Sequence, residues 1–410
     1  MQNIAKVLND KVYELSAESV FLNGDFKFYE GQTTFLISDI LSNFAPCGKV
    51  AFLYFQSSFD NYSNRYTRSA KSVGYKCTNV ILPDDFHDAI EHYSGLFNLA
   101  EDIRMIITRD VELYNATKYF ATVRNIPCVL IYDSARNYGL LSTSAQIKNG
   151  RNIENFTFNC DCHFIIDANC FDNNTGFLSD VYAHLVSHAL SLADYRINCF
   201  IKGENPQKLA YQTATQAIKE AYAVFSHPYE KQAEVLIKNL FILELANAIC
   251  GGALTKSFCG YNCYLLDKTC QNQGVAQLYY AIKCAKIYAL YLSGEYSQIT
   301  DYPDYLTRAI QLGEHFNHPQ DTFIKNFTRA FNLIDERKDK IPRLIEIITP
   351  DITNFIQCSN AMLSTFKALK GQTITDFSYQ RFALKHCGDC LNYINGMTLV
   401  RESGITEKIQ

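Results

Sequence analysis

The order of apolar segments constrains the fold of this 410-residue chain more than any other feature. In the first part, short apolar runs alternate with segments whose apolar residues recur every three to four positions. The runs, each expected to form a strand, are 50–55, 79–82, 105–107, 127–132 and 163–167. The segments of helical spacing between them are 61–73, 84–98 and 112–123. Such alternation predicts a parallel β-sheet with helices on both faces.

From about residue 176 the apolar spacing becomes helical throughout. The expected helices are 177–200, 206–225, 230–249, 275–293, 302–316, 320–334, 351–369 and 376–402. The polar, turn-rich segment 172–176 is typical of a junction. We therefore expect an α/β domain of nucleotide-binding type over residues 1–172 and an all-helical domain over residues 173–410.

Composition narrows the classes of partner. The formal net charge of −4 is small, and no basic run with interleaved aromatics occurs, so we expect no nucleic-acid partner. No apolar stretch reaches the ~20 residues that span a bilayer, so we expect no membrane partner. Residues 1–15 lack an apolar signal segment, which favours a cytoplasmic location. The fifteen scattered cysteines are then expected to be reduced thiols, mostly in the core.

The turn between the run 105–107 and the helix 112–123 lies where a dinucleotide pyrophosphate would bind. Backbone approaches a pyrophosphate closely only where side chains are absent, so these turns are rich in glycine. Here the turn reads Arg109-Asp110-Val111 and contains no glycine. Asp110 would also bring a negative charge to the phosphates. The fold indicated by the segment and the function indicated by its turn therefore disagree.

Several short motifs occur in the order and spacing of a known group of enzymes. They are Thr117-Lys118-Tyr119-Phe120-Ala121, Asn125-Ile126-Pro127, Phe177-Leu178-Ser179-Asp180 and Asp194-Tyr195. Through them nearly the whole chain resembles the superfamily of iron-containing alcohol dehydrogenases and dehydroquinate synthases, most closely its glycerol-1-phosphate dehydrogenase branch. The resemblance implies a dehydroquinate synthase-like fold, a homodimer and a polyol or polyol-phosphate dehydrogenase that uses NAD(P) and Zn or Fe.

The resemblance also implies site residues, and most of them are replaced here. The positions of the glycine loop hold Arg109, Asp110 and Val111, and Asn115 stands for the aspartate that follows the loop. The nicotinamide and substrate loop reads Tyr132-Asp133-Ser134-Ala135-Arg136-Asn137-Tyr138-Gly139, with Tyr138 at its acidic position. Of the three metal ligands, Asp180 is retained, while Tyr261 and Gln273 stand where the family has histidines. We therefore expect no bound dinucleotide and no catalytic metal at the family's positions.

Two alternatives remain for a metal. Asp180, His184 and His188 are spaced i, i+4, i+8, so they share one helix face and can form a relocated Zn²⁺ site. Otherwise the two histidines are buried polar residues bonded to neighbouring groups. Two cysteine clusters, Cys160-Asp161-Cys162-His163 and His386-Cys387-Gly388-Asp389-Cys390, can together hold a structural zinc only if they converge. Otherwise the first cluster lies in a loop before a strand, and the second cluster lies on a helix and faces the core.

Cationic residues offer an anion site. Arg109 and Arg136 are expected at the carboxyl ends of parallel strands, where ligands of open α/β sheets bind, with Lys118 adding a charge. The alternative is a salt bridge from an arginine to Asp133 or Asp110. The sequence thus favours a degenerate, non-redox relative of the dehydrogenases that keeps a cleft for a small anionic ligand or a protein partner. The rivals are an active polyol dehydrogenase with atypical loops and a different metal-dependent enzyme.

Overall fold

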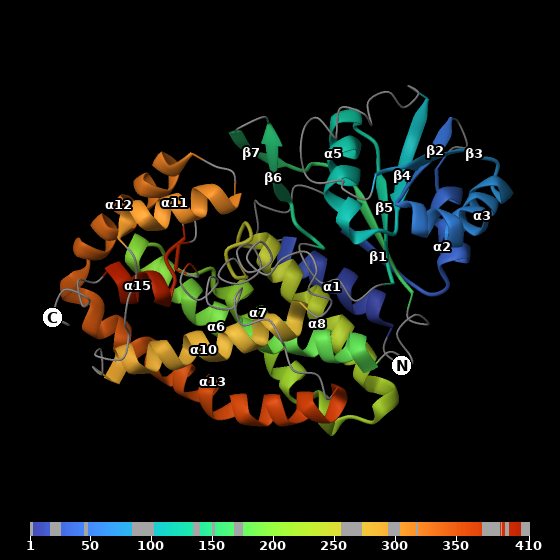
Figure 1. Cartoon of the computed structure of the whole chain (residues 1–410). Helices are drawn as coiled ribbons and strands as arrows, with labels where there is room; N and C mark the ends of the chain where they lie inside the picture. Colours follow the sequence, from blue (N-terminus) through green and yellow to red (C-terminus); the bar gives the residue numbers. More distant parts are fainter. Residues whose placement is uncertain are drawn as a thin grey trace. The chain divides into compact units, whose positions relative to one another are not determined.

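The computed structural model describes residues 3–16, 26–44, 48–83, 102–133, 140–149, 152–167, 175–255, 273–293, 304–316, 319–370, 386, 388–389 and 393–402. The chain divides into two compact units (Figure 1). The first, called the α/β unit below, comprises Met1–Asn174 and Pro228–Gly251, and the helical unit comprises Thr175–His227 and Gly252–Gln410. Within the described ranges, no helix combines the length and apolar character that a bilayer crossing requires.

The α/β unit is built on a six-stranded sheet in which every neighbouring pair of strands is parallel. The strand order is β1 (Phe26–Glu30), β8 (Cys162–Ile166), β5 (Cys128–Tyr132), β4 (Ile103–Thr108), β2 (Lys49–Tyr54) and β3 (Lys76–Ile81). Every residue of β5 and β8 is buried, as expected for strands that are covered on both faces. The predicted parallel sheet is therefore confirmed.

Alternate side chains of these strands pack on opposite faces. On one face, α2 (Thr33–Ser42) and α3 (Gln56–Ser72) cover a core that includes Phe52, Ile107 and Ile131. On the other face, the ring of Phe164 contacts Tyr114 of α5 (Tyr114–Arg124). This two-sided burial holds the strand ends in fixed positions, and those ends form the candidate site below.

Helix α8 (Tyr229–Ile249) belongs to the α/β unit, although the boundary expected from the sequence placed it in the helical domain. Its Phe241 ring lies 5.1 Å from Tyr132 and 5.5 Å from Phe28, so it packs on the sheet. The helix also packs against α1 (Ile4–Ser16). Periodicity predicts that a segment is helical but does not say which core its apolar side chains join. The first change of unit, between Asn174 and Thr175, falls at the expected junction.

Some elements differ from those expected. Four features have no counterpart among the elements expected from the sequence. They are α1, β1, α2 and the antiparallel hairpin of β6 (Ser144–Asn149) and β7 (Asn152–Thr157). The hairpin is polar, so its sequence lacks the apolar run that marks a buried strand. The expected helix 84–98 lies outside the described residues.

The helical unit contains no strand in its described part. Its helices are α6 (Thr175–Lys202), α7 (Lys208–Tyr222), α10 (Gln273–Ser293), α11 (Tyr305–Phe316), α12 (Gln320–Asp335), α13 (Ile341–Lys370) and α15 (Gly396–Glu402). Helix α6 packs against α7, α10 and α13. Helix α13 begins ten residues before the expected start and includes Pro350. Of the expected helix 376–402, residues 393–395 are not helical and α15 follows them.

Gly274 sets the distance between α6 and α10. A Cβ atom at this position would overlap the carbonyl oxygen of Asp180 and would lie 3.0 Å from the backbone nitrogen of His184. Because two helix backbones meet here, neither neighbour can move aside as a flexible side chain would. We expect Gly274→Ala to lower the free energy of unfolding by about 1–3 kcal/mol, measured by urea denaturation.

Lys286→Ala is the matched control, because Lys286 lies exposed on the same helix. Its loss should change the free energy of unfolding by less than ~0.5 kcal/mol. If Gly274→Ala proved as harmless as the control, the close approach of α6 and α10 would be contradicted.

Candidate functional site

Four charged residues gather where the central strands of the sheet end. Arg109 and Asp110 follow β4, Asp133 follows β5 and Asp167 follows β8. The carboxyl ends of parallel strands meet at one edge of the sheet, and ligands of open α/β folds bind there. We call these four residues the carboxyl-edge cluster.

The carboxylate of Asp110 binds the start of helix α3. Its Oδ2 accepts a hydrogen bond from the backbone N–H of Phe55 at 2.9 Å, and its Oδ1 accepts one from the Ser58 hydroxyl. Phe55 is the N-cap residue of α3, whose first amide groups carry partial positive charge. Asp110 therefore stabilises this helix terminus, and both of its carboxylate oxygens are bonded to groups of the protein itself.

Arg109 forms a salt bridge with Asp133. The Nε and Nη2 atoms of Arg109 both donate to Asp133 Oδ2, the first at 3.0 Å. The guanidinium also lies 3.5 Å from the ring centroid of Tyr62. Burial raises the pKa of Asp133, while Arg109 opposes that shift. For Arg109, the structure thus shows the salt-bridge alternative that the sequence left open.

Asp167 is the one residue of the carboxyl-edge cluster that was not expected from the sequence to be a site residue. Its Oδ2 accepts hydrogen bonds from the backbone nitrogen of Thr33 at 3.1 Å and from the Thr33 hydroxyl at 2.7 Å. Thr33 is the first residue of α2, so this carboxylate also stabilises a helix start. The available signal was that Asp167 is an acidic residue at the carboxyl end of an apolar run, as Asp133 is.

The carboxyl-edge cluster does not fit a dinucleotide pyrophosphate. The Asp110 carboxylate stands in the turn where the fold would bind the pyrophosphate, and its charge repels a pyrophosphate group at that turn. A short 3₁₀ turn, Val111–Leu113, precedes α5, and Glu112 adds another acidic residue to the start of that helix. Asn115 lies in the first turn of α5. Ser134, Arg136 and Tyr138 lie outside the described residues.

Lys118 does not lie at the surface as an anion site would require. Its side chain is buried, and its Nζ donates to the carbonyl oxygen of Ser142 at 2.8 Å and lies 4.9 Å from the Phe158 ring centroid. Burial raises the pKa of Glu244 on α8 to about 7, and the charge of Lys118 opposes the shift. Lys118 is thus part of the interior of the α/β unit.

Asp180, His184 and His188 lie buried on α6, but each is bonded to a neighbouring group. Asp180 Oδ1 accepts a hydrogen bond from the backbone nitrogen of Gly274 at 2.8 Å, at the start of α10. His184 Nδ1 lies 3.2 Å from Gln277 Oε1, and His188 Nε2 lies 3.1 Å from Gln277 Nε2. Burial lowers the pKa of His184 to about 4 and lowers that of His188 as well. Both imidazoles are therefore neutral at pH 7.

These three side chains do not converge on one point. Among the described residues, no cluster of three potential ligand atoms includes Asp180, His184 or His188. Tyr261 lies outside the described residues, and the side chain of Gln273 is not described either. Of the three ligand positions that the resemblance implies, Asp180 alone has a described side chain.

The two cysteine clusters belong to different units. Cys160 and Cys162 lie in the α/β unit, next to Cys128 of β5. Cys387 and Cys390 lie outside the described residues. In the helical unit, His386 Nδ1 lies 2.8 Å from Asp389, which also pairs with Arg308 at 2.6 Å. The structure thus places a third thiol, that of Cys128, beside Cys160 and Cys162. The residues around Cys160 and Cys162 in the sequence did not predict it.

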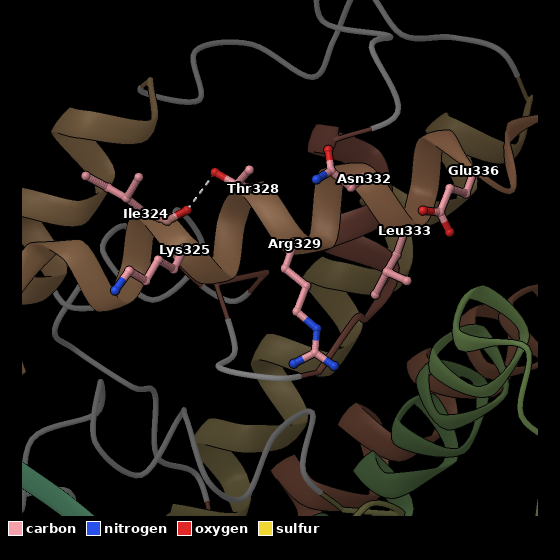
Figure 2. A pocket seen from close by; sticks show the side chains of 7 residues that line it. All are labelled: Ile324, Lys325, Thr328, Arg329, Asn332, Leu333 and Glu336. Atoms are coloured by element: carbon pink, nitrogen blue, oxygen red, sulfur yellow. Dashed lines mark hydrogen bonds between the residues drawn. The ribbon is translucent and has the colours of Figure 1, made fainter.

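A surface pocket of about 440 Å³ follows one side of α12 (Figure 2). Its lining residues are Ile324, Lys325, Thr328, Arg329, Asn332, Leu333 and Glu336. The Thr328 hydroxyl donates to the carbonyl oxygen of Ile324 within the helix, and the lining includes no histidine or cysteine. The pocket therefore lacks a nucleophile paired with a base. A second pocket, of about 420 Å³, lies against α1 and β1.

Comparison with known proteins identifies the fold. No family model matches the chain, and no curated protein matches it in sequence. Solved structures that match over 85–93% of the chain include an iron-containing alcohol dehydrogenase, a glycerol dehydrogenase and a butanol dehydrogenase. The chain has the fold of these proteins, an N-terminal α/β part followed by helices, which confirms the fold that the resemblance implied.

Three of these structures show how distant the similarity is. Iron-containing alcohol dehydrogenase from Thermococcus thioreducens has a TM-score of 0.51 at 13% identity, over 91% of this chain and 93% of that one. Glycerol dehydrogenase from Schizosaccharomyces pombe has a TM-score of 0.50 at 12% identity, over 85% and 92%. NADH-dependent butanol dehydrogenase A from Thermotoga maritima has a TM-score of 0.50 at 14% identity, over 93% and 90%. At such identities the likeness concerns the fold alone.

The role of Asp110 can be tested by Asp110→Ala. The substitution leaves the Phe55 amide and the Ser58 hydroxyl without their acceptor, so we expect the free energy of unfolding to fall by about 2 kcal/mol. Asp60→Ala is the control, because Asp60 is an exposed carboxylate on α3 itself. Equal stabilities of the two variants in urea denaturation would contradict the assigned role.

The buried histidine pair predicts a dependence of stability on pH. The unfolded chain binds a proton at His184 below pH ~6.5, whereas the folded protein does so only near its pKa of about 4. The contribution of His184 to the free energy of unfolding is therefore fully present above pH ~6.5. It is lost as the pH falls towards 4, by about 3 kcal/mol at most. Glu244 acts in the opposite direction, because its raised pKa makes stability fall as the pH rises from ~4.5 to 7.

Comparison of variants separates the effect of His184 on the pH dependence of the unfolding free energy from the effect of Glu244. His184→Gln should flatten the dependence of the unfolding free energy on pH between 4 and 6.5, measured by urea denaturation at several pH values. His227→Gln, at an exposed histidine, should leave it unchanged. A dependence that is the same in all three proteins would show that His184 is not held neutral.

Proposed function

We propose that this protein is a non-redox relative of the NAD(P)- and metal-dependent polyol dehydrogenases, and that it uses their fold for binding rather than for hydride transfer. The observation that carries the proposal is the carboxyl-edge cluster. Its three aspartates are engaged by Phe55, Ser58, Arg109 and Thr33. These contacts support the proposal because they use the side chains that stand where the fold would place a pyrophosphate.

The energetic argument concerns what a dinucleotide would have to displace. A pyrophosphate at this turn would break the hydrogen bonds of Asp110 or lie beside its charge. Each charge-assisted hydrogen bond lost costs about 1.5–3 kcal/mol, and the repulsion between like charges adds to that cost. A glycine turn gains binding energy at the same place because its N–H groups point at the phosphates. The two effects together remove most of the affinity that the fold could provide.

The absence of a suitable ligand set supports the same proposal. A metal ion in a dehydrogenase of this fold would polarise the substrate alcohol as a Lewis acid. Among the described residues, Asp180 alone stands at a family ligand position, and its Oδ1 binds Gly274.

The ligand proposed for the α/β unit is a small anionic molecule at Arg109. Nε and Nη2 of Arg109 bind Asp133, while Nη1 has no hydrogen-bond partner among the residues that the structure describes. A phosphate or carboxylate can accept from Nη1 without breaking the salt bridge. A protein partner is the other binding role. A homodimer and a cytoplasmic location, both expected from the sequence, are part of this proposal.

An active NAD(P)-dependent polyol dehydrogenase is the second candidate, because the fold is that of proteins described as glycerol and butanol dehydrogenases. Calorimetric titration of the purified full-length protein with NADH and NADPH distinguishes the two. We expect no dissociation constant tighter than about 10 μM, or about −7 kcal/mol, for either dinucleotide. Tighter binding, with oxidation of glycerol, would overturn the non-redox proposal.

A parallel titration with inorganic phosphate tests the anion site. We expect the wild-type protein to bind phosphate and Arg109→Gln to bind it at least ten-fold more weakly. Arg65→Gln, at an exposed arginine on α3, is the control and should bind phosphate as the wild type does. Phosphate binding that is the same in all three proteins would remove Arg109 from the site and leave the protein-partner role.

A further inference from the structure

Three cysteine side chains meet at the edge of the sheet opposite to the carboxyl-edge cluster. Cys128 is the first residue of β5 and Cys162 is the first residue of β8, and the two are register partners in neighbouring parallel strands. Cys160 lies two residues before β8. Because all strands run the same way, strand starts lie at one edge and Arg109, Asp133 and Asp167 at the other. We call the three cysteines the thiol triad.

The sulfur atoms of the triad are close enough to share one ion. Cys128 Sγ and Cys162 Sγ are 3.4 Å apart, and Cys160 Sγ and Cys162 Sγ are 3.7 Å apart. All three lie within 4.8 Å of one another. Three sulfurs that bind one ion in a plane at about 2.3 Å lie about 4 Å apart. The triad therefore needs only small side-chain shifts to reach that geometry.

The triad lies next to Lys118 of α5. The Cys160 thiol donates to the backbone carbonyl oxygen of Lys118, with the sulfur 3.6 Å from that oxygen. Lys118 is buried, so its positive charge is poorly screened by solvent. Deprotonated sulfur is the form that binds metal ions.

We propose that Cys128, Cys160 and Cys162 form a binding site for one Cu(I) ion, held by three thiolates. The proposal is independent of the function proposed for the carboxyl-edge cluster. On binding, thiols of the triad that are still protonated release their protons to solvent, and no oxidation or reduction takes place.

The choice of ion follows from the ligand set. Thiolates are soft ligands and select soft ions such as Cu(I). Among the described residues, no fourth histidine, cysteine, aspartate or glutamate has a ligand atom in the group. A structural zinc site normally has four protein ligands, whereas Cu(I) is stable with three sulfurs. Cys160 is the most exposed member, with 9% of its surface accessible, and it offers the path by which an ion enters.

Anaerobic titration of the reduced, full-length protein with Cu(I), in competition with a chromogenic Cu(I) chelator, tests the proposal. We expect one ion per chain to be held against the chelator, with absorbance from sulfur-to-copper charge transfer and a rise in melting temperature. Cys160→Ser should weaken binding at least 100-fold. Cys199→Ser is the control, because Cys199 is a buried free thiol of the helical unit, and it should bind as the wild type does.

Each outcome decides the matter. Circular dichroism checks that Cys160→Ser is folded, and Cys162→Ser provides a second variant if it is not. Retention of copper by both triad variants, or failure of the wild type to compete with the chelator, would overturn the proposal. A disulfide between Cys128 and Cys162 in the anaerobically purified protein, detected by mass spectrometry, would overturn it as well.

Discussion

Helix starts in the α/β unit depend on carboxylates that follow the strands. Asp110 binds the backbone amide of Phe55, the N-cap residue of α3, and Asp167 binds the first residue of α2. These hydrogen bonds connect the ends of β4 and β8 to the two helices that cover one face of the sheet. The same strand ends are where a protein of this fold would bind a dinucleotide. In this chain the carboxylates at that edge bind two helix starts, and the non-redox proposal rests on this observation.

The salt bridge of Arg109 and Asp133 completes this arrangement. Asp133 is buried, so its charge would be costly without a partner, and Arg109 provides that partner while its guanidinium stacks on Tyr62. Loss of the glycines alone would have left an open turn. In this chain an arginine and an aspartate stand there instead, and both take part in a network of hydrogen bonds and a salt bridge. The changes in this loop are thus mutually consistent, which is why we interpret them as a change of function.

Much of the fold was predictable from the sequence, because it follows from local patterns. The apolar runs of β2, β4, β5 and β8 are buried on both faces, so each appears as a continuous apolar segment. The polar hairpin of β6 and β7 has no such signal. The placement of α8 was not predictable either, since packing of Phe241 on the sheet depends on residues far away in the sequence.

The candidate site was predictable only in part, for a similar reason. The missing glycines and the possible pairing of Arg109 with Asp133 follow from adjacent residues and from strand order. That Asp110 and Asp167 bind helix starts depends on contacts with Phe55 and Thr33, which are 55 and 134 residues away. The thiol triad likewise requires β5 and β8 to be neighbours, although a hairpin separates them in the chain. Periodicity does not specify which strands are neighbours.

The most direct test of the central claim is a crystal structure of the protein grown in the presence of excess NADH. The claim predicts that Asp110 contacts Phe55 and Ser58, that Arg109 pairs with Asp133, and that no density for a pyrophosphate lies beside them. Density for a dinucleotide at the turn before α5, with the Asp110 carboxylate turned away from α3, would contradict it.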